Sequence, residues 1–347
     1  PLRKALTSGK KASYNGDDMR EQDDLYLIAE LEDKILQTIY EYVENVPRPF
    51  GLLLSGGFDS GLLAAVTKPD FVFTVRFPYG VKYDESRYAD AIIDHLGLRA
   101  KTTVLIPRKE DFEENAAEAI KAVGKPITHF SVVPFYMVMK LAAERMKSQG
   151  VTPHVLSGEG PDEYLGGYAR QIIFDEILSM YKIPELRNYH ETIDRVLKKD
   201  SSYKEEHLVR MYGEMMKYPE SRVKDYASMF DLPLQGRIGK MDMELGVIEK
   251  MEQKLAQVAG VTLHYPYINK EFAEYCYKLP DSLKIRDGVT KWAFRQICKK
   301  YLPGFMMDRA KMGGPVAPIN LWLNKPELGF GKEAWLKFQE AILNENK

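Results

Sequence analysis

The stretch that most constrains the fold runs from Phe50 to Val66, where a short glycine turn separates two apolar segments. The first segment, Gly51 to Leu54, is short and continuously apolar, which is typical of a strand buried on both faces of a parallel sheet. We interpret the second segment as a helix. The sequence therefore predicts a strand, a turn and a helix, with free amide groups at the helix start directed at an anion.

The turn itself reads Ser-Gly-Gly-Phe-Asp-Ser. Gly56 and Gly57 permit backbone conformations that are closed to residues with a Cβ, and they let phosphate oxygens approach the amides. Ser55 and Ser60 add hydroxyl donors. Asp59 would be repelled by phosphates unless Mg²⁺ bridges them, so it indicates a metal-bound polyphosphate. The competing interpretation is an ordinary tight turn with a solvated Asp59, because short motifs also match by chance.

The apolar pattern predicts alternating strands and helices up to about residue 170. Beyond the first strand and helix, strands are expected at 71–77, 102–106 and 153–156, and helices at 23–43, 84–96, 110–123 and 132–147. Such alternation implies an α/β fold with a parallel sheet, helices on both faces and ligands at the carboxyl ends of the strands. After Ala169 helical patterns predominate. We expect a flexible tail at 1–22, an α/β domain at 23–170 and a helical C-terminal part at 171–347 that completes the substrate pocket.

Composition and charge exclude several classes of protein. The 347 residues are 45% apolar and 29% charged, as in globular proteins, and their net charge is -1. A dedicated nucleic-acid binder would carry a basic excess, so nucleic acid is not an expected partner. No signal-peptide core and no apolar run of about 18 residues occur, so no membrane partner is expected. We expect a cytoplasmic protein in which Cys276 and Cys298 are buried thiols and form no disulfide.

A second glycine turn follows the fourth predicted strand and reads Ser-Gly-Glu-Gly-Pro-Asp-Glu-Tyr-Leu-Gly-Gly-Tyr. By itself, a solvated loop in which Asp162 caps a helix and Glu163 favours the helix dipole would explain it. Two such turns at strand ends of one parallel sheet, however, would open onto the same crevice. The carboxylates of Asp59 and Asp162 would then hold Mg²⁺ between them, with a triphosphate completing its shell.

The first turn resembles the Ser-Gly-Gly-x-Asp-Ser loop of the ATP pyrophosphatases. Together the two turns resemble the synthetase domain of the asparagine synthetases, which carries Ser-Gly-Gly-Leu-Asp-Ser and Ser-Gly-Glu-Gly-Ser-Asp-Glu at a comparable separation. The resemblance covers about Asp33 to Trp322 and implies an adenine nucleotide α-hydrolase-like fold. It also implies ATP and Mg²⁺ as cofactors of an AMP-forming amide synthetase. In that chemistry a carboxylate attacks the α-phosphorus of ATP and releases pyrophosphate, and ammonia or an amine then attacks the acyl-adenylate.

The resemblance also implies roles for individual residues. It implies that the pyrophosphate end of ATP is held by Ser55, Gly57, Asp59 and Ser60, and that the adenosine lies near Leu54, Val75, Ser157 and Gly158. Glu159 matches the glutamate implicated in deprotonating the attacking nitrogen. Lys291 matches the lysine that offsets charge developing on the phosphates, although a solvated lysine is the alternative. Lys311 and Arg309 are weaker candidates for contacts with the same phosphates.

The sequence departs from the family pattern in two places. Asparagine synthetases begin with a cysteine that helps hydrolyse glutamine, whereas this sequence starts at Pro1. We therefore expect free ammonia, an amine or a separate glutaminase partner to supply nitrogen. The acceptor stretch of the family, approximately Glu-x-Arg-x-Pro-Phe-Leu-Asp, here runs from Thr262 to Asn269 and reads Thr-Leu-His-Tyr-Pro-Tyr-Ile-Asn. Aspartate is therefore in doubt as the carboxylate substrate. His264 is either a substrate contact or a partly buried, hydrogen-bonded histidine.

Three other functions stay open at this point. A β-lactam synthetase or lasso cyclase type of ligase is one, although Glu159 favours attack by ammonia or a simple amine. A tRNA-modifying ATP pyrophosphatase is the second, and the balanced charge disfavours it. The third is a nucleotide-binding regulatory subunit, which would not require Glu159 and Lys291. Homodimer formation is also left open.

Overall fold

Five short parallel strands form the sheet at the centre of the computed structural model, which describes residues 16–77, 84–127, 131–167, 250–287, 289–309, 322–323, 325–329 and 331–344. They are β1 (Gly51–Leu53), β2 (Phe71–Val75), β3 (Thr102–Leu105), β4 (His154–Leu156) and β5 (Thr262–His264). Their order in the sheet is β3-β2-β1-β4-β5, and every neighbouring pair is parallel. The predicted α/β fold with a parallel sheet is confirmed.

The strand order creates a switch point between β1 and β4. Leu52 pairs with Val72 of β2 on one side and with Leu156 of β4 on the other. The chain leaves β1 toward β2 and β3, and it later returns to the opposite side of β1 to form β4. Connections diverge at such a point and leave a crevice beyond the carboxyl ends of the two strands. Both glycine turns begin at this place, one after β1 and one after β4.

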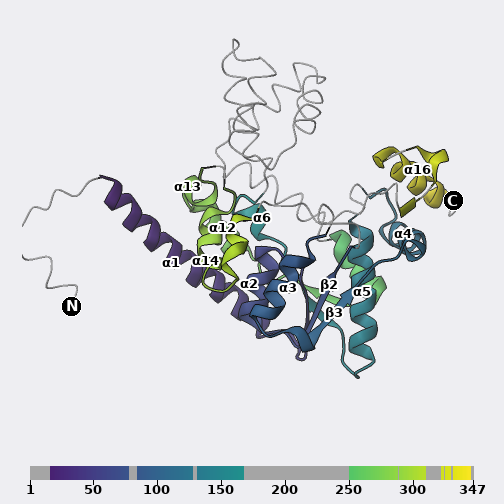
Figure 1. The fold of residues 1–347 in the computed structure, drawn as a ribbon, viewed down its shortest axis with the longest axis horizontal. Helices are drawn as coiled ribbons and strands as arrows, with labels where there is room; N and C mark the ends of the chain where they lie inside the picture. Colours follow the sequence, from purple (N-terminus) through teal and green to yellow (C-terminus); the bar gives the residue numbers. More distant parts are fainter. Residues whose placement is uncertain are drawn as a thin grey trace, which may run out of the picture.

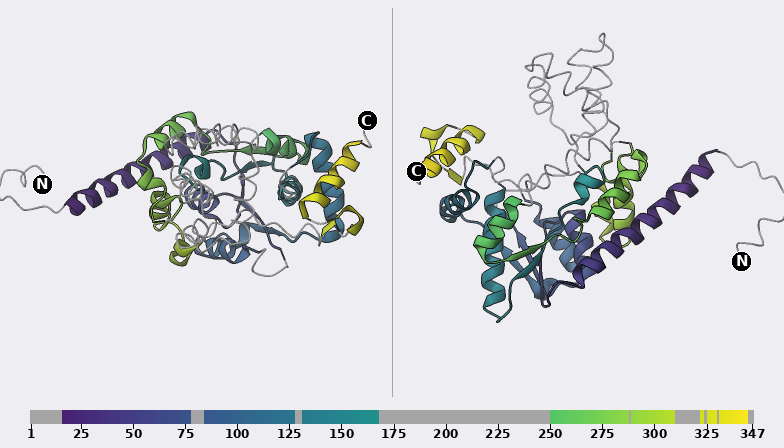
Figure 2. Two further views of the ribbon diagram at one scale, coloured as in Figure 1. Left: turned by 90° about the horizontal axis from the view of Figure 1, so that it is seen from above. Right: turned by 180° about the vertical axis from the view of Figure 1, so that it is seen from behind.

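Helices cover both faces of the sheet (Figure 1 and Figure 2). One face carries α1 (Gly16–Val43), α2 (Phe58–Thr67), α3 (Ser86–His95), α12 (Lys270–Lys278) and α14 (Trp292–Cys298), with short α6 (Pro161–Tyr164) and α13 (Asp281–Lys284) beside them. The other face carries α5 (Val132–Lys147) and a helix at residues 250–259, while α4 (Lys109–Val123) packs against α5 and α16 (Gly331–Asn344) packs against α4. Short 3-10 helices are η2 (Arg99–Lys101), η4 (Gly304–Asp308) and η5 (Pro326–Leu328).

Alternating strand residues divide the core into two layers. Val72 and Leu156 are fully buried against the first helical layer, whereas their strand neighbours Phe73 and Val155 are buried against the second. This period of two is what strands covered on both faces require, because successive side chains point to opposite faces.

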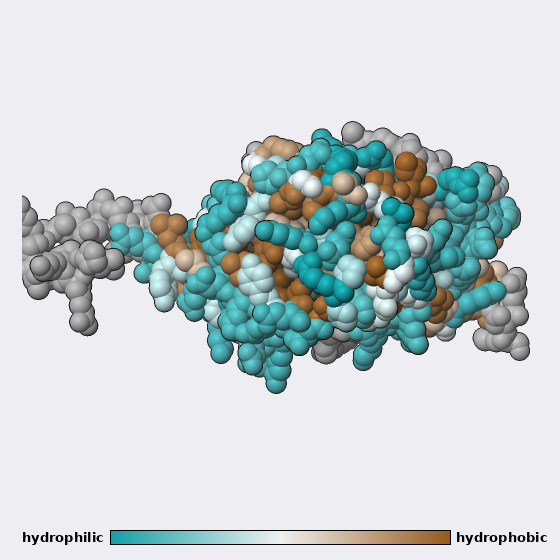
Figure 3. All heavy atoms as spheres, turned by 90° about the horizontal axis from the view of Figure 1, so that it is seen from below, coloured by the Kyte–Doolittle hydropathy of each residue, from teal (hydrophilic) through white to brown (hydrophobic). Residues whose placement is uncertain are grey.

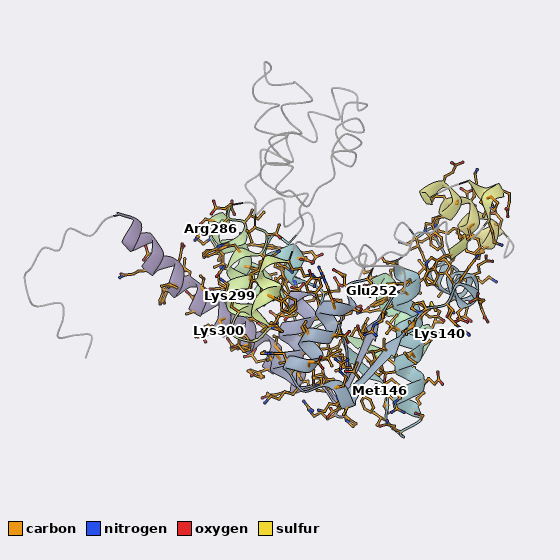
Figure 4. All side chains as sticks on the ribbon, viewed as in Figure 1. Lys140, Met146, Glu252, Arg286, Lys299 and Lys300 are labelled. Atoms are coloured by element: carbon orange, nitrogen blue, oxygen red, sulfur yellow. The ribbon has the colours of Figure 1, made fainter. Side chains whose placement is uncertain are left out.

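Helix α1 is the longest element of the first layer. Leu31, Ile35 and Ile39, spaced four residues apart, are fully buried. Arg286 donates to Asp24 at 2.8 Å, and Lys300 pairs with Glu32, so the C-terminal segment also holds this helix (Figure 4). The N-terminal part of α1 projects from the body, and hydrophobic residues lie on it (Figure 3).

Strand β5 was not predicted. It has only three residues, and of these only Leu263 is buried, so the segment is too short to show a strand period in the sequence. The strand forms because the edge of β4 offers backbone partners, and the pairing continues where Ser157 N donates to His264 O at 2.8 Å. A segment expected to belong to the helical C-terminal part therefore completes the sheet.

Other elements agree with the predicted ranges to within a few residues, except that α1 begins at Gly16, seven residues before the predicted start. Residues 168–249 lie outside the described part of the chain, so the division into domains stays a prediction. Cys276 and Cys298 are free and fully buried, as expected. Within the described residues, no helix is both long and apolar enough to cross a bilayer.

We predict that Ile35→Ala lowers the free energy of unfolding by about 2–5 kcal/mol, because loss of the fully buried side chain leaves a cavity where α1 packs against α2, α12 and α14. The matched control on the same helix is Tyr40→Ala, whose side chain is 51% exposed. The control is expected to change stability by no more than about 0.5 kcal/mol. Urea unfolding followed by circular dichroism measures both. Equal effects for the two variants would contradict the docking of α1 on this face.

Candidate active site

The two glycines of the first turn differ in backbone conformation. Gly56 has a φ of 82°, and a Cβ added there would lie 2.7 Å from the backbone nitrogen of Ala89 in α3. Gly57 has an ordinary φ of -78° and is the residue that precedes α2. The expectation that both glycines need a special backbone conformation is therefore correct for Gly56 and wrong for Gly57.

Both serines of the turn contact each other. Ser55 N donates to the Oγ of Ser60 at 3.2 Å, and the two hydroxyl oxygens lie 3.1 Å apart. Gly57 N donates to the Oγ of Ser55 at 3.2 Å. Ser60 is buried and Ser55 is exposed. In the described structure these hydroxyls stabilise the turn, and their contact with a phosphate stays a prediction.

The second turn lies directly against the first. A Cβ added to Gly158 would come within 2.8 Å of the backbone nitrogen of Ser60, so the close approach needs a glycine. Tyr267, fully buried after β5, donates its hydroxyl to the backbone oxygen of Asp59 at 3.0 Å. The structure thus brings together two turns that lie about a hundred residues apart in the sequence.

Lys291 joins the carboxylates of the two turns. Its Nζ lies 2.7 Å from both carboxylate oxygens of Asp59 and 2.7 Å from Oδ1 of Asp162. The lysine side chain is only 3% exposed, so the interpretation as a solvated lysine is wrong. Coulombic attraction is stronger in such a water-poor place than at the surface, and removal of one partner leaves a buried charge unpaired.

The backbone at Lys291 is also unusual. Its φ is 50°, a left-handed conformation that few residues other than glycine adopt, and it immediately precedes α14. Such a conformation costs roughly 1–3 kcal/mol and persists where the surrounding structure imposes it. Here the Lys291 N donates to Gly166 O at 3.3 Å, which ties the lysine to the end of the second turn.

Asp59 and Asp162 suit a magnesium ion. One ammonium group contacts both carboxylates, which shows that a single cation can reach both, and carboxylate oxygens are ligands that Mg²⁺ prefers. Among the residues that the structure describes, no group of three or more His, Cys, Asp or Glu is arranged for a metal. Phosphate oxygens and water would therefore supply the other ligands.

The remaining predicted site residues fall into three groups. Leu54 is buried at the end of β1, Val75 ends β2, and Ser157 is buried at the end of β4, so all three lie around the crevice. Glu159 is half-buried in the second turn. Lys311 lies outside the described residues.

Arg309 contacts the backbone of the first turn and a neighbouring acidic side chain. Its guanidinium donates to Gly56 O and pairs with the carboxylate of Glu85, which directly precedes α3. Sequence reasoning missed Glu85, because an acid at a helix start is most simply interpreted as a cap. The only available signal was the acid-rich stretch Asp84-Glu85 before a predicted helix.

The residues of the acceptor stretch, 262–269, make different kinds of contact. His264 Nε2 lies 3.0 Å from His154 Nδ1, and its ring contacts Tyr42 of α1 edge to face, so this half-buried histidine is hydrogen-bonded. A contact of His264 with a substrate stays a prediction. The histidine lines a cavity of about 420 Å³ between α1 and the start of α12. The Asn269 side chain caps α12 by accepting from Phe272 N at 3.0 Å. Tyr267 provides the contact with the first turn.

The family model and the curated proteins that match this chain point to the same family. The asparagine synthase family model matches residues 45–330. Similar curated proteins include the glutamine-hydrolyzing asparagine synthetase 1 of Bacillus subtilis (strain 168), 23% identical over 332 residues, which are 86% of this chain and 50% of that protein. A putative glutamine-hydrolyzing asparagine synthetase of Mycobacterium tuberculosis (strain ATCC 25618 / H37Rv) is 25% identical over 316 residues, 80% of this chain and 46% of that protein. The chain spans about half the length of these curated relatives.

We predict that Gly158→Ala destabilises the protein by about 1–3 kcal/mol, because the new Cβ would push the second turn away from the start of α2. Gly304→Ala is the matched control, since no atom lies within 4 Å of a Cβ added there. The control is expected to shift stability by no more than about 0.5 kcal/mol. Urea unfolding tests the pair. If Gly158→Ala leaves the stability unchanged, the close contact between the two turns is contradicted.

We also predict that the His264 environment makes stability depend on pH. Burial, and next the nearby His154, lower the pKa of His264 from 6.5 to about 4. Between these values the unfolded chain binds a proton that the folded protein excludes. The stabilisation from the neutral ring is therefore complete above pH 6.5 and is lost as the pH falls toward 4.

The loss is at most about 3 kcal/mol, because one pKa unit corresponds to about 1.4 kcal/mol. His154, Glu41 and Tyr42 are the other titratable groups around this ring. Urea midpoints measured from pH 7 to pH 4 should fall less steeply for His264→Gln than for the unchanged protein. His95→Gln, an exposed control, should keep the original slope.

Proposed function

Because the chain belongs to the asparagine synthase family, we propose that it is an ATP-dependent carbon–nitrogen ligase that forms AMP and pyrophosphate. It activates a substrate carboxylate and transfers the acyl group to ammonia or an amine. Such a ligase must hold a polyphosphate, neutralise its charge and expose the α-phosphorus to the carboxylate. The proposal therefore depends on the site at the switch point.

The observation that carries the proposal is the shared contact of Lys291 with Asp59 and Asp162. Two acids and one lysine from three separate segments meet in a nearly buried place, at the carboxyl ends of β1 and β4. A site that only shapes the fold would not require such a concentration of charge, since apolar groups of similar volume are often at least as stable. Charged side chains that are nearly buried and paired with one another in a crevice are typical of functional sites.

The residues of the first turn would bind the departing pyrophosphate. In the proposal, the amides at the start of α2 and the hydroxyls of Ser55 and Ser60 hold its oxygens. Asp59 and Asp162 would hold Mg²⁺, which neutralises phosphate charge. The adenosine lies along the strand ends, next to Leu54, Val75, Ser157 and Gly158.

Two bond exchanges make up the reaction. An oxygen of the substrate carboxylate attacks the α-phosphorus, and the bond from that phosphorus to the bridging oxygen of the pyrophosphate breaks. Lys291 offsets the negative charge that develops on the leaving group. The nitrogen of ammonia or an amine then attacks the acyl carbon, the bond to AMP breaks, and Glu159 accepts the proton released from nitrogen.

The nitrogen source and location belong to the same proposal. Free ammonia, an amine or ammonia from a separate glutaminase partner would serve as the nucleophile, and Glu159 favours a small one. The differences from the family between Thr262 and Asn269 support a carboxylate other than aspartate. The free, buried cysteines are consistent with a reducing compartment and support the cytoplasm as its location.

We predict that the protein, incubated with ATP, Mg²⁺, a panel of carboxylic acids and ammonium, releases AMP and pyrophosphate in equal amounts. Asp59→Asn should lower this rate about 100- to 1,000-fold, as expected when one electrostatic contact of a reaction site is removed. Asp94→Asn is the control, since that side chain is 64% exposed on α3. Release of ADP and phosphate, or an unchanged rate in Asp59→Asn, would refute the proposed function.

A further inference from the structure

A buried ion pair lies behind the first glycine turn. Nη2 of Arg309 pairs with Oε1 of Glu85, and their side chains are only 6% and 4% exposed. Nη1 of the same guanidinium donates to the backbone oxygen of Gly56. The group also lies over the ring of Tyr88, with its central carbon 4.4 Å from the ring centre. One arginine therefore contacts a carboxylate, a carbonyl oxygen and an aromatic ring.

This arginine is itself fixed by α14, the helix that follows Lys291. Arg295 of α14 donates to the backbone oxygen of Arg309 at 2.8 Å and to that of Thr290 at 2.9 Å. Lys291 immediately precedes α14. The same short C-terminal segment thus presents one cation to the acids of the site and another to the back of the first turn.

The contact with Gly56 controls the direction of one peptide group. In a trans peptide, the carbonyl oxygen and the following N–H point to opposite sides. The Gly56 oxygen points to Arg309, and the Gly57 N–H points the other way, to the Oγ of Ser55. A rotation of this peptide would turn a carbonyl oxygen toward the ligand side of the turn, where it would repel phosphate oxygens.

Stability alone does not account for such a pair. Removing two charges from water is expensive, so a buried ion pair is often no more stable than apolar residues of the same volume. A guanidinium differs from an ammonium in that its fixed fork reaches two acceptors at once. At this place the two acceptors are Glu85 and Gly56 O, which is the arrangement needed to orient the turn.

We propose that Arg309 and Glu85 are positioning residues that hold the Gly56 carbonyl away from the phosphates and so maintain the first turn in its pyrophosphate-binding form. The inference rests on the proposed function, because it assigns the pair to the binding of ATP and pyrophosphate. From the sequence, Arg309 is a candidate for direct contact with the phosphates. In this proposal Arg309 instead acts on them indirectly, by orienting the first turn.

The test compares affinity with stability in a set of variants. Glu85→Leu and Arg309→Met each remove one charge of the buried pair and keep the other, so each should lose both stability and affinity. The double variant removes both charges and should recover most of the unfolding midpoint. Its affinity for Mg²⁺-pyrophosphate and Mg²⁺-ATP, measured by calorimetry, should stay about 10- to 100-fold weaker than that of the unchanged protein.

Arg309→Lys covers the case in which the double variant folds poorly. A lysine keeps the charge opposite Glu85 but cannot reach two acceptors with a planar fork. We expect it to fold and to raise KM for ATP about tenfold or more, with a smaller change in kcat, because one charged hydrogen bond to the turn is lost.

The control is Arg48→Met. Arg48 also contacts a carboxylate, a carbonyl oxygen and a ring, namely Asp70 at 3.0 Å, Thr67 O at 2.8 Å and Phe50 at 4.4 Å, but it lies before β1, at the opposite end of that strand. The Arg48→Met variant should leave both affinities unchanged.

Recovery of stability and affinity together in the double variant would overturn the positioning role. Absence of binding by the unchanged protein would instead overturn the proposed function, and the positioning role with it.

Discussion

The contact of the Lys291 ammonium with two carboxylates is the interaction on which the arrangement of the site depends. Asp59 follows β1, Asp162 follows β4, and Lys291 precedes a helix more than a hundred residues further along the chain. Because all three charges are largely removed from water, none of the segments can move away without breaking an ion pair that is largely shielded from solvent. The interaction therefore fixes both turns and α14 relative to one another.

The two parts of the chain contribute different chemistry to this place. The N-terminal part supplies the acids and the free amides of the turns, whereas residues 289–309 supply the cations that balance them. Arg309 opposes Glu85 behind the first turn, and Lys291 opposes the acids in front of it. Strand β5 and Tyr267 add a third connection, since the tyrosine hydroxyl reaches the backbone of Asp59. An N-terminal part without these C-terminal segments would lack the charges of Lys291 and Arg309 that pair with these acids.

Sequence reasoning predicted the parts of the site that depend on local patterns. Both glycine turns, the strands before them and the meeting of Asp59 with Asp162 followed from apolar runs, turn residues and the geometry of parallel sheets. It failed where a residue's role depends on a distant partner. Gly57 has an ordinary backbone although its sequence context is that of Gly56, Glu85 resembled a helix cap, and β5 was too short to show a period.

The sequence by itself determined the fold class, the place of the crevice and the residue types around it, because hydrophobic periodicity and glycine turns are properties of consecutive residues. Only the tertiary structure decided how the charges are paired. It placed Lys291 between two acids, directed Arg309 to Glu85 and the first turn, and paired His264 with His154. The reason is that burial and charge compensation depend on which segments meet in space. The positions of residues along the chain do not reveal which segments these are.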